Sequence, residues 1–126
     1  MPDTTLTYII LEDTYYVAID LRDTVKRLRP RYRLAGIAEE TAEAIRMIQS
    51  EEPDLMIADT TAGDGDSISV LQRGATDIPV IFISEYAVLE ERAQNLNMID
   101  FILKPVTIPD LERAINRFDA MKQTTG

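Results

Sequence analysis

Apolar residues follow two alternating patterns along this chain. Short runs rich in β-branched residues have the length of buried strands, and in the stretches between them apolar residues recur every three or four positions, which is typical of helices. The predicted strands cover residues 6–11, 32–37, 54–58, 78–83 and 99–103. The predicted helices cover residues 14–29, 40–51 and 67–73, a segment marked by Leu89, Ala93 and Leu96, and a last segment that begins after Thr107.

The ends of several predicted helices carry their own signals. Pro30 disfavours helical geometry at Arg29 and so ends the first helix. Gly74 stands at the usual position of a C-terminal cap, and Thr107 can cap the start of the last helix. The buried stripe of that last helix is expected to comprise Ile108, Leu111, Ile115 and Phe118.

The alternation of strands and helices predicts an α/β fold, in which a five-stranded parallel sheet is covered by helices on both faces. A chain of 126 residues, 45% of them hydrophobic, fits one such domain. We expect residues 1–121 to form this domain and residues 122–126 to form a polar tail or the start of a linker.

The composition narrows the function further. A net charge of −9 argues against nucleic-acid binding by this segment, which would require a basic patch. The chain has no cysteine and no histidine, so a bound metal would need oxygen ligands, which favours Mg²⁺, Ca²⁺ or Mn²⁺. No apolar stretch approaches the length of a membrane span and the first residues lack the features of a signal peptide, so we expect a cytoplasmic protein without membrane contact.

Polar residues stand where the predicted strands end. Glu12 and Asp13 follow the first strand, Asp59 the third, Ser84 the fourth and Lys104 the fifth. The carboxyl ends of parallel strands meet at one edge of a sheet, which is where ligands bind in open α/β folds. We therefore expect three carboxylates, a hydroxyl and an ammonium to surround one site.

These groups suit phosphoryl transfer. Three neighbouring carboxylates repel one another unless a cation lies between them, and Mg²⁺ suits such a site because it completes its shell with phosphate oxygens. One carboxylate can then attack a phosphoryl group as a nucleophile, giving an acyl phosphate. The Mg²⁺ ion, the Ser84 hydroxyl and the Lys104 ammonium would each neutralise one phosphoryl oxygen.

Each residue alone has a simpler interpretation. Glu12 and Asp13 could be the first turn of a helix, where acids suit the dipole. Ser84 could cap the fourth helix, and Lys104 could mark a turn before proline. The agreement of all these positions with strand ends favours the combined site.

The motifs IILED, PDLMIAD, IFIS and DFILKP together resemble the receiver domain of a bacterial two-component response regulator, over about residues 6–118. The resemblance implies a flavodoxin-like fold with the strand order 2-1-3-4-5. Asp59 resembles the aspartate that is phosphorylated in this family. Glu12 and Asp13 resemble the Mg²⁺-binding pair, and the backbone carbonyl of Thr61 is implied as a further ligand.

The resemblance extends to the groups that sense phosphorylation. Lys104 resembles the phosphate-binding lysine, in a Lys-Pro bond that is usually cis in the family. Ser84 and Phe101 match the two switch positions, at which a hydroxyl moves toward the phosphoryl group and an aromatic ring rotates inward behind it. A change of charge at Asp59 would thus bias a packed two-state element.

The expected partner is a cognate sensor histidine kinase, and a homodimer is a second partner to consider. The segment SEY followed by LNMIDFILKP is similar to receivers of the LytTR type, whose attached output domain binds DNA and regulates transcription. DNA contact would require such an output domain, which these 126 residues lack. We expect no enzymatic activity beyond the domain's own phosphorylation and dephosphorylation.

Two departures from the family pattern keep a second function open. The loop TTAGDGDS has Gly63 where many receivers have proline and Ser67 where they have glycine. Glu85 follows the switch hydroxyl, where the family usually has a small residue, and its charge is expected to modulate access and slow the reaction with small phosphodonors. The alternative is an atypical receiver that acts as a protein–protein interaction module without phosphorylation.

Other sites with similar residues fit less well. A haloacid-dehalogenase-like phosphatase would need a second aspartate where Thr61 stands, and a flavodoxin-like electron carrier would need a phosphate-binding loop instead of EDTYY. A calcium loop that starts at Asp64 would need glycine where Ser69 stands. Asp64 and Asp66 are therefore interpreted as solvated loop acids.

Overall fold

The computed structural model describes residues 5–63, 65–74 and 76–125. Its five strands form one parallel sheet in the order β2-β1-β3-β4-β5, which confirms the expected fold class and strand order. The strands are β1 (Thr7–Leu11), β2 (Arg33–Ala38), β3 (Leu55–Asp59), β4 (Val80–Ser84) and β5 (Met98–Leu103). The helices are α1 (Tyr15–Leu28), α2 (Thr41–Glu51), α3 (Ser67–Arg73), the 3₁₀ turn η1 (Ala87–Leu89), α4 (Glu90–Ala93) and α5 (Ile108–Thr125).

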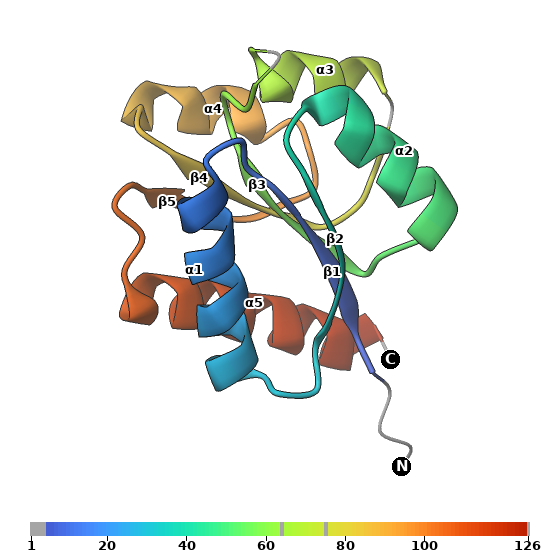
Figure 1. The fold of residues 1–126 in the computed structure, drawn as a ribbon, viewed down its shortest axis with the longest axis vertical. Coiled ribbons are helices and arrows are strands. Elements are labelled where there is room, and N and C mark those ends of the chain that lie inside the picture. Colours follow the sequence, from blue (N-terminus) through green and yellow to red (C-terminus); the bar gives the residue numbers. More distant parts are fainter. Residues whose placement is uncertain (1–4, 64, 75, 126) are drawn as a thin grey trace.

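Helices cover both faces of the sheet. Helices α1 and α5 lie on one face, and α2, α3 and α4 lie on the other (Figure 1). Each face has its own apolar cluster, one built around Phe118 of α5 and one around Phe82 of β4. The interior strands β3 and β4 are buried along their whole length because helices cover both of their sides.

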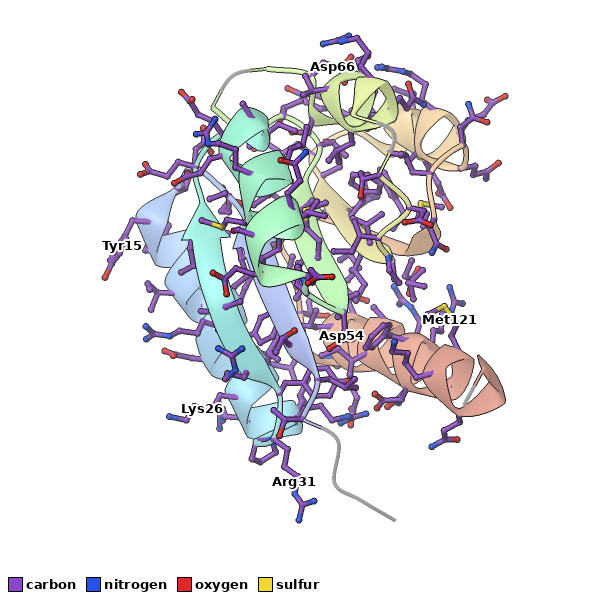
Figure 2. All side chains as sticks on the ribbon, turned by 90° about the vertical axis from the view of Figure 1, so that its right-hand side faces the viewer. Tyr15, Lys26, Arg31, Asp54, Asp66 and Met121 are labelled. Carbon is purple, nitrogen blue, oxygen red and sulfur yellow. The ribbon has the colours of Figure 1, made fainter. Side chains whose placement is uncertain are left out.

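The strand register brings the polar residues to one edge. Leu11 of β1 pairs with Ala58 of β3, so Glu12 and Asp59 follow at the same level. Ser84 of β4 pairs with the last residue of β5, which places Lys104 directly beyond it. In Figure 2 Asp66, on the loop beyond this edge, lies at the top of the view, and Asp54, just before β3, lies below it near mid-height.

Three helix boundaries agree with their sequence signals. Helix α1 ends at Leu28, and Arg29 leaves helical geometry before Pro30 as predicted. The Thr107 hydroxyl accepts a hydrogen bond from the Asp110 N–H at 3.2 Å, which confirms the predicted cap of α5. Helix α3 ends at Arg73 with Gly74 as its C-terminal cap, as predicted, and Gly74 has a right-handed φ of −74°.

Two expectations about helices were wrong in detail. Ile108 is 49% exposed because it opens α5, and the buried stripe begins one turn later at Leu111. The fourth helix is reduced to a 3₁₀ turn and the single turn Glu90–Ala93, and Leu96 lies beyond its end. Helix α5 extends to Thr125, and the assignment of residues 122–126 as a polar tail or the start of a linker stays a prediction.

None of the helices in the described ranges combines the length and the apolar content that a membrane crossing requires.

Candidate functional site

The carboxylate of Asp59 stands at the end of β3 with an ammonium beside it. Asp59 is 4% exposed and Glu12, which follows the neighbouring strand β1, is 1% exposed. Lys104 Nζ donates hydrogen bonds to both side chains, at 2.7 Å from Asp59 Oδ2 and 3.2 Å from Glu12 Oε1. The Lys104–Pro105 peptide bond is cis, as the family resemblance implied.

The backbone around Glu12 rules out the simpler interpretation of the first acidic pair. Helix α1 begins at Tyr15 and has no acidic residue in its first turn, so Glu12 and Asp13 precede the helix. Glu12 Oε2 accepts a hydrogen bond from the Thr14 N–H at 3.1 Å, which leaves Oε1 to face Lys104. Glu12 and Asp13 thus lie between the end of β1 and the cap of α1 rather than in the first turn of the helix.

Glu12, Asp13 and Asp59 form what we name the acidic cluster. Each offers one oxygen, and these oxygens lie within 4.8 Å of one another. Among the described residues, Lys104 is the cation paired with the cluster, so three negative charges face one positive charge. An oxygen donor set with this charge excess fits a divalent cation, and Mg²⁺ in particular.

The charge excess also shifts the protonation equilibria of the site. Burial raises the pKa of Glu12 and the charge of Asp59 adds to this, although the Thr14 N–H and Lys104 oppose it. Burial would lower the pKa of Lys104, but the hydrogen bond and charge of Asp59, reinforced by Glu12, raise it overall. Lys104 therefore remains an ammonium, whereas burial disfavours the charged form of Glu12, which a bound cation would favour.

The loop after β3 holds the other oxygen of Asp59. The Thr61 N–H donates to Asp59 Oδ1 at 2.9 Å, and the Thr61 hydroxyl donates to the same atom at 3.3 Å. The two carboxylate oxygens of Asp59 therefore have different partners, the loop and Lys104. Thr61 lies beside the acidic cluster, and its role as a carbonyl ligand stays a prediction.

Ser84 lies at the end of β4 in a fully buried position. Its hydroxyl accepts hydrogen bonds from the Thr60 hydroxyl at 2.8 Å and from the Tyr86 N–H at 3.0 Å, and donates to the Tyr86 carbonyl at 3.3 Å. Sequence reasoning missed Thr60, because a lone threonine after a strand gives no signal of the hydroxyl that it will meet. The structure reveals it through its complete burial.

The remaining predicted residues flank this core. Phe101 pairs with Phe82 across β5 and β4 and packs, partly buried, in the apolar cluster under α2, α3 and α4. Glu85 is exposed and lines a cavity of about 460 Å³ together with Lys104, Pro105 and residues of α1. Glu85 thus places a negative charge in a cavity that Lys104 also lines, and its effect on access stays a prediction.

The loop between Asp59 and α3 explains one departure from the family pattern. A Cβ atom at Gly63 would lie 2.7 Å from the Glu39 carbonyl oxygen, so the close approach of the two loops requires glycine. Asp66 caps α3 by accepting from the Ser69 N–H at 3.2 Å, and it pairs with Arg92 of α4 at 2.7 Å. Asp66 therefore has a structural role; Asp64 lies outside the described residues.

Comparison with protein families gives an independent result. Residues 8–116 match the family model described as the response regulator receiver domain. Two curated bacterial relatives are each 27% identical to this chain. They are the transcriptional regulatory protein CitB of Klebsiella pneumoniae, matched over 90% of this chain and 50% of its own length, and PdtaR of Mycobacterium tuberculosis, matched over 94% and 60%.

Solved structures agree with this match. The signal receiver domain of a modulated diguanylate cyclase from Desulfovibrio desulfuricans G20 superposes with a TM-score of 0.80 at 25% identity, covering 98% of this chain and 100% of that one. The receiver domain of PhyR from Erythrobacter litoralis superposes with a TM-score of 0.76 at 26% identity, covering 90% and 89%. The fold and the edge of the sheet that holds the acidic cluster are thus those of a known family.

Proposed function

Because the chain belongs to the family of response regulator receiver domains, we propose that Asp59 accepts a phosphoryl group and that the resulting change at Ser84 and Phe101 controls an output. The observation that carries this proposal is the placement of Asp59 Oδ2 at 2.7 Å from Lys104 inside an acidic cluster with excess negative charge. A carboxylate so placed has beside it an ammonium that can neutralise a phosphoryl oxygen, and further carboxylate oxygens that can bind a cation.

The reaction follows from this geometry. A phosphohistidine of a sensor histidine kinase would lose its P–N bond as an Asp59 oxygen forms the new P–O bond, and the imidazole would leave. The Lys104 ammonium would hold one phosphoryl oxygen. The carboxylates of the acidic cluster and the Thr61 carbonyl would hold Mg²⁺, which supplies positive charge to the phosphoryl oxygens when bound.

The output and the location are finer parts of the proposal. The chain spans about half to three fifths of the length of the curated relatives it matches. Both are described as transcriptional regulatory proteins, which supports transcription as the controlled output through a further domain of the LytTR or another type. We retain a cytoplasmic location, where kinase and output would meet, and no enzymatic activity beyond self-phosphorylation and dephosphorylation.

An interaction module that works without phosphorylation is the second candidate. Two observations favour it: the Ser84 hydroxyl is engaged by Thr60 and Tyr86, and Glu85 adds negative charge beside Lys104. Such a module would use the same fold to bind a protein partner or a second copy of the chain.

Incubation with acetyl phosphate and Mg²⁺, followed by intact-mass measurement, separates the two functions. We expect the wild-type chain to gain one phosphoryl group and Asp59→Asn to gain none. Asp66→Asn, which alters an exposed acid on the following loop, is the matched control and should still be phosphorylated. A folded wild-type chain that gains no phosphoryl group would favour the interaction module, and equal labelling of Asp59→Asn would contradict Asp59 as the acceptor.

A further inference from the structure

Two buried hydroxyl groups meet one residue beyond Asp59. Thr60 and Ser84 are both 0% exposed, and Thr60 Oγ1 donates a hydrogen bond to Ser84 Oγ at 2.8 Å. The Thr60 N–H also donates to the Ile83 carbonyl at 3.0 Å, which fixes the backbones of the two strands against each other. We name this contact the Thr60–Ser84 hydroxyl pair.

The Ser84 hydroxyl cannot form a further hydrogen bond in this arrangement. A serine hydroxyl has one proton to donate and two lone pairs to accept with. In the described structure, Thr60 and the Tyr86 N–H occupy the lone pairs, and the Tyr86 carbonyl receives the proton. Ser84 can therefore turn toward a phosphoryl group on Asp59 only if these contacts break.

Among the contacts of the Ser84 hydroxyl, the hydrogen bond from Thr60 is the one whose loss costs the most free energy. Tyr86 is 52% exposed, so water can replace Ser84 at its N–H and carbonyl. Thr60 is fully buried, so its hydroxyl would lose its acceptor where water does not reach. A buried donor left without a partner is costly, whereas an apolar group of the same shape is not.

We infer that Thr60 is a positioning residue that holds Ser84 in the unphosphorylated arrangement and thereby weakens the site's affinity for a phosphoryl group. The inference rests on the proposed phosphorylation of Asp59 and concerns the regulation of that site. It predicts that a side chain of the same shape without the Thr60 hydroxyl strengthens the binding of a phosphoryl analogue at Asp59.

The test uses beryllofluoride, a phosphoryl analogue, titrated with Mg²⁺ into the whole chain and followed by calorimetry. Thr60→Val, which removes the hydroxyl and retains the shape, is expected to bind about 5 to 30 times more tightly than wild type. Thr60→Ser, which retains the hydroxyl, should bind within about twofold of wild type. Thr60→Ala removes the same hydroxyl and replaces the valine variant if thermal melts show that the latter does not fold.

A Ser84→Ala background distinguishes positioning from packing. Without the Ser84 hydroxyl, Thr60→Val should no longer change the affinity, whereas a packing effect would persist. The inference is overturned if Thr60→Val binds no more tightly than wild type, if Thr60→Ser behaves like Thr60→Val, or if the gain persists in Ser84→Ala. Failure of wild type itself to bind beryllofluoride would overturn the proposed function and this inference together.

Discussion

Two nearly buried aspartates of this domain differ in how the chain balances their charge. Asp100 of β5 is 8% exposed. It forms ion pairs with two arginines of α5, Arg113 at 2.9 Å and Arg117 at 3.1 Å. Asp59 of β3 is 4% exposed and shares the single ammonium of Lys104 with a second buried carboxylate, as far as the described residues show.

The difference shows what distinguishes a functional acid from a structural one in this fold. Burial is similar at the two positions, so burial alone does not identify the site. The chain itself supplies two guanidinium groups to Asp100, one of which also pairs with Asp110, so the charges there balance, whereas the acidic cluster around Asp59 keeps an excess of negative charge. A cluster with excess negative charge is stabilised by a bound cation that comes from solution.

The largest change in stability is expected when the acidic cluster loses the ammonium of Lys104. Lys104→Met leaves Glu12 and Asp59 buried without compensation, and should lower the free energy of unfolding by about 3 kcal/mol in the absence of divalent ions. Arg117→Met is the matched change at Asp100, where Arg113 remains, and should cost less than about 1 kcal/mol. Urea unfolding measures both, and equal losses would contradict the contrast.

The same substitution should act with opposite sign in the two regions. Asp100→Asn weakens two arginine contacts and should lower the free energy of unfolding by about 2 kcal/mol. Asp59→Asn relieves repulsion within the acidic cluster and should raise the free energy of unfolding by about 1 kcal/mol in the absence of Mg²⁺. Thermal melts in EDTA test the signs, and a loss of stability in Asp59→Asn equal to that in Asp100→Asn would refute them.

A smaller effect is expected in the pH dependence of stability, and its sign follows from the pKa of Glu12. The pKa of Glu12 is raised above its ordinary value of 4.5 in the folded chain, so the folded state binds the proton more tightly than the unfolded state. Between 4.5 and the raised pKa, stability should therefore increase as pH falls and decrease as pH rises. Glu12→Gln should lack this slope in metal-free melts; an identical slope in both chains would contradict the assignment.

The smallest effect is expected at the exposed rim of the site. Glu85→Ala removes one negative charge from the cavity that Lys104 also lines, and should raise the rate of phosphorylation by acetyl phosphate about two- to threefold. Exposed charges interact weakly, which limits the gain. Glu90→Ala, on the exposed side of α4, serves as the control, and an unchanged or lower rate in Glu85→Ala would reject the role of Glu85.

The sequence predicted the parts of this molecule that depend on periodicity. Strand order came from the family resemblance, and the sheet edge that holds Glu12, Asp59 and Lys104 came from the positions at which apolar runs end. Local signals that act within one turn, such as Pro30 and Thr107, were also reliable.

The sequence could not predict what depends on contacts between distant segments. The Thr60–Ser84 hydroxyl pair joins residues 24 positions apart, and nothing near Thr60 in the sequence indicates its partner. Ile108 fits the apolar stripe of the last helix in the sequence, but it opens α5 and is half exposed. The charge balance that separates Asp59 from Asp100 likewise becomes visible only when both sets of neighbours are known.

A titration of the isotope-labelled chain with Mg²⁺, followed residue by residue through amide NMR signals, tests the central claim most directly. We predict saturable shifts at Asp13, Asp59 and Thr61, with unchanged signals at Asp100 and Arg113. Saturation should require higher Mg²⁺ concentrations in Asp59→Asn. The account would be contradicted by an acidic cluster that shows no shifts, or by equal shifts at the cluster and around Asp100.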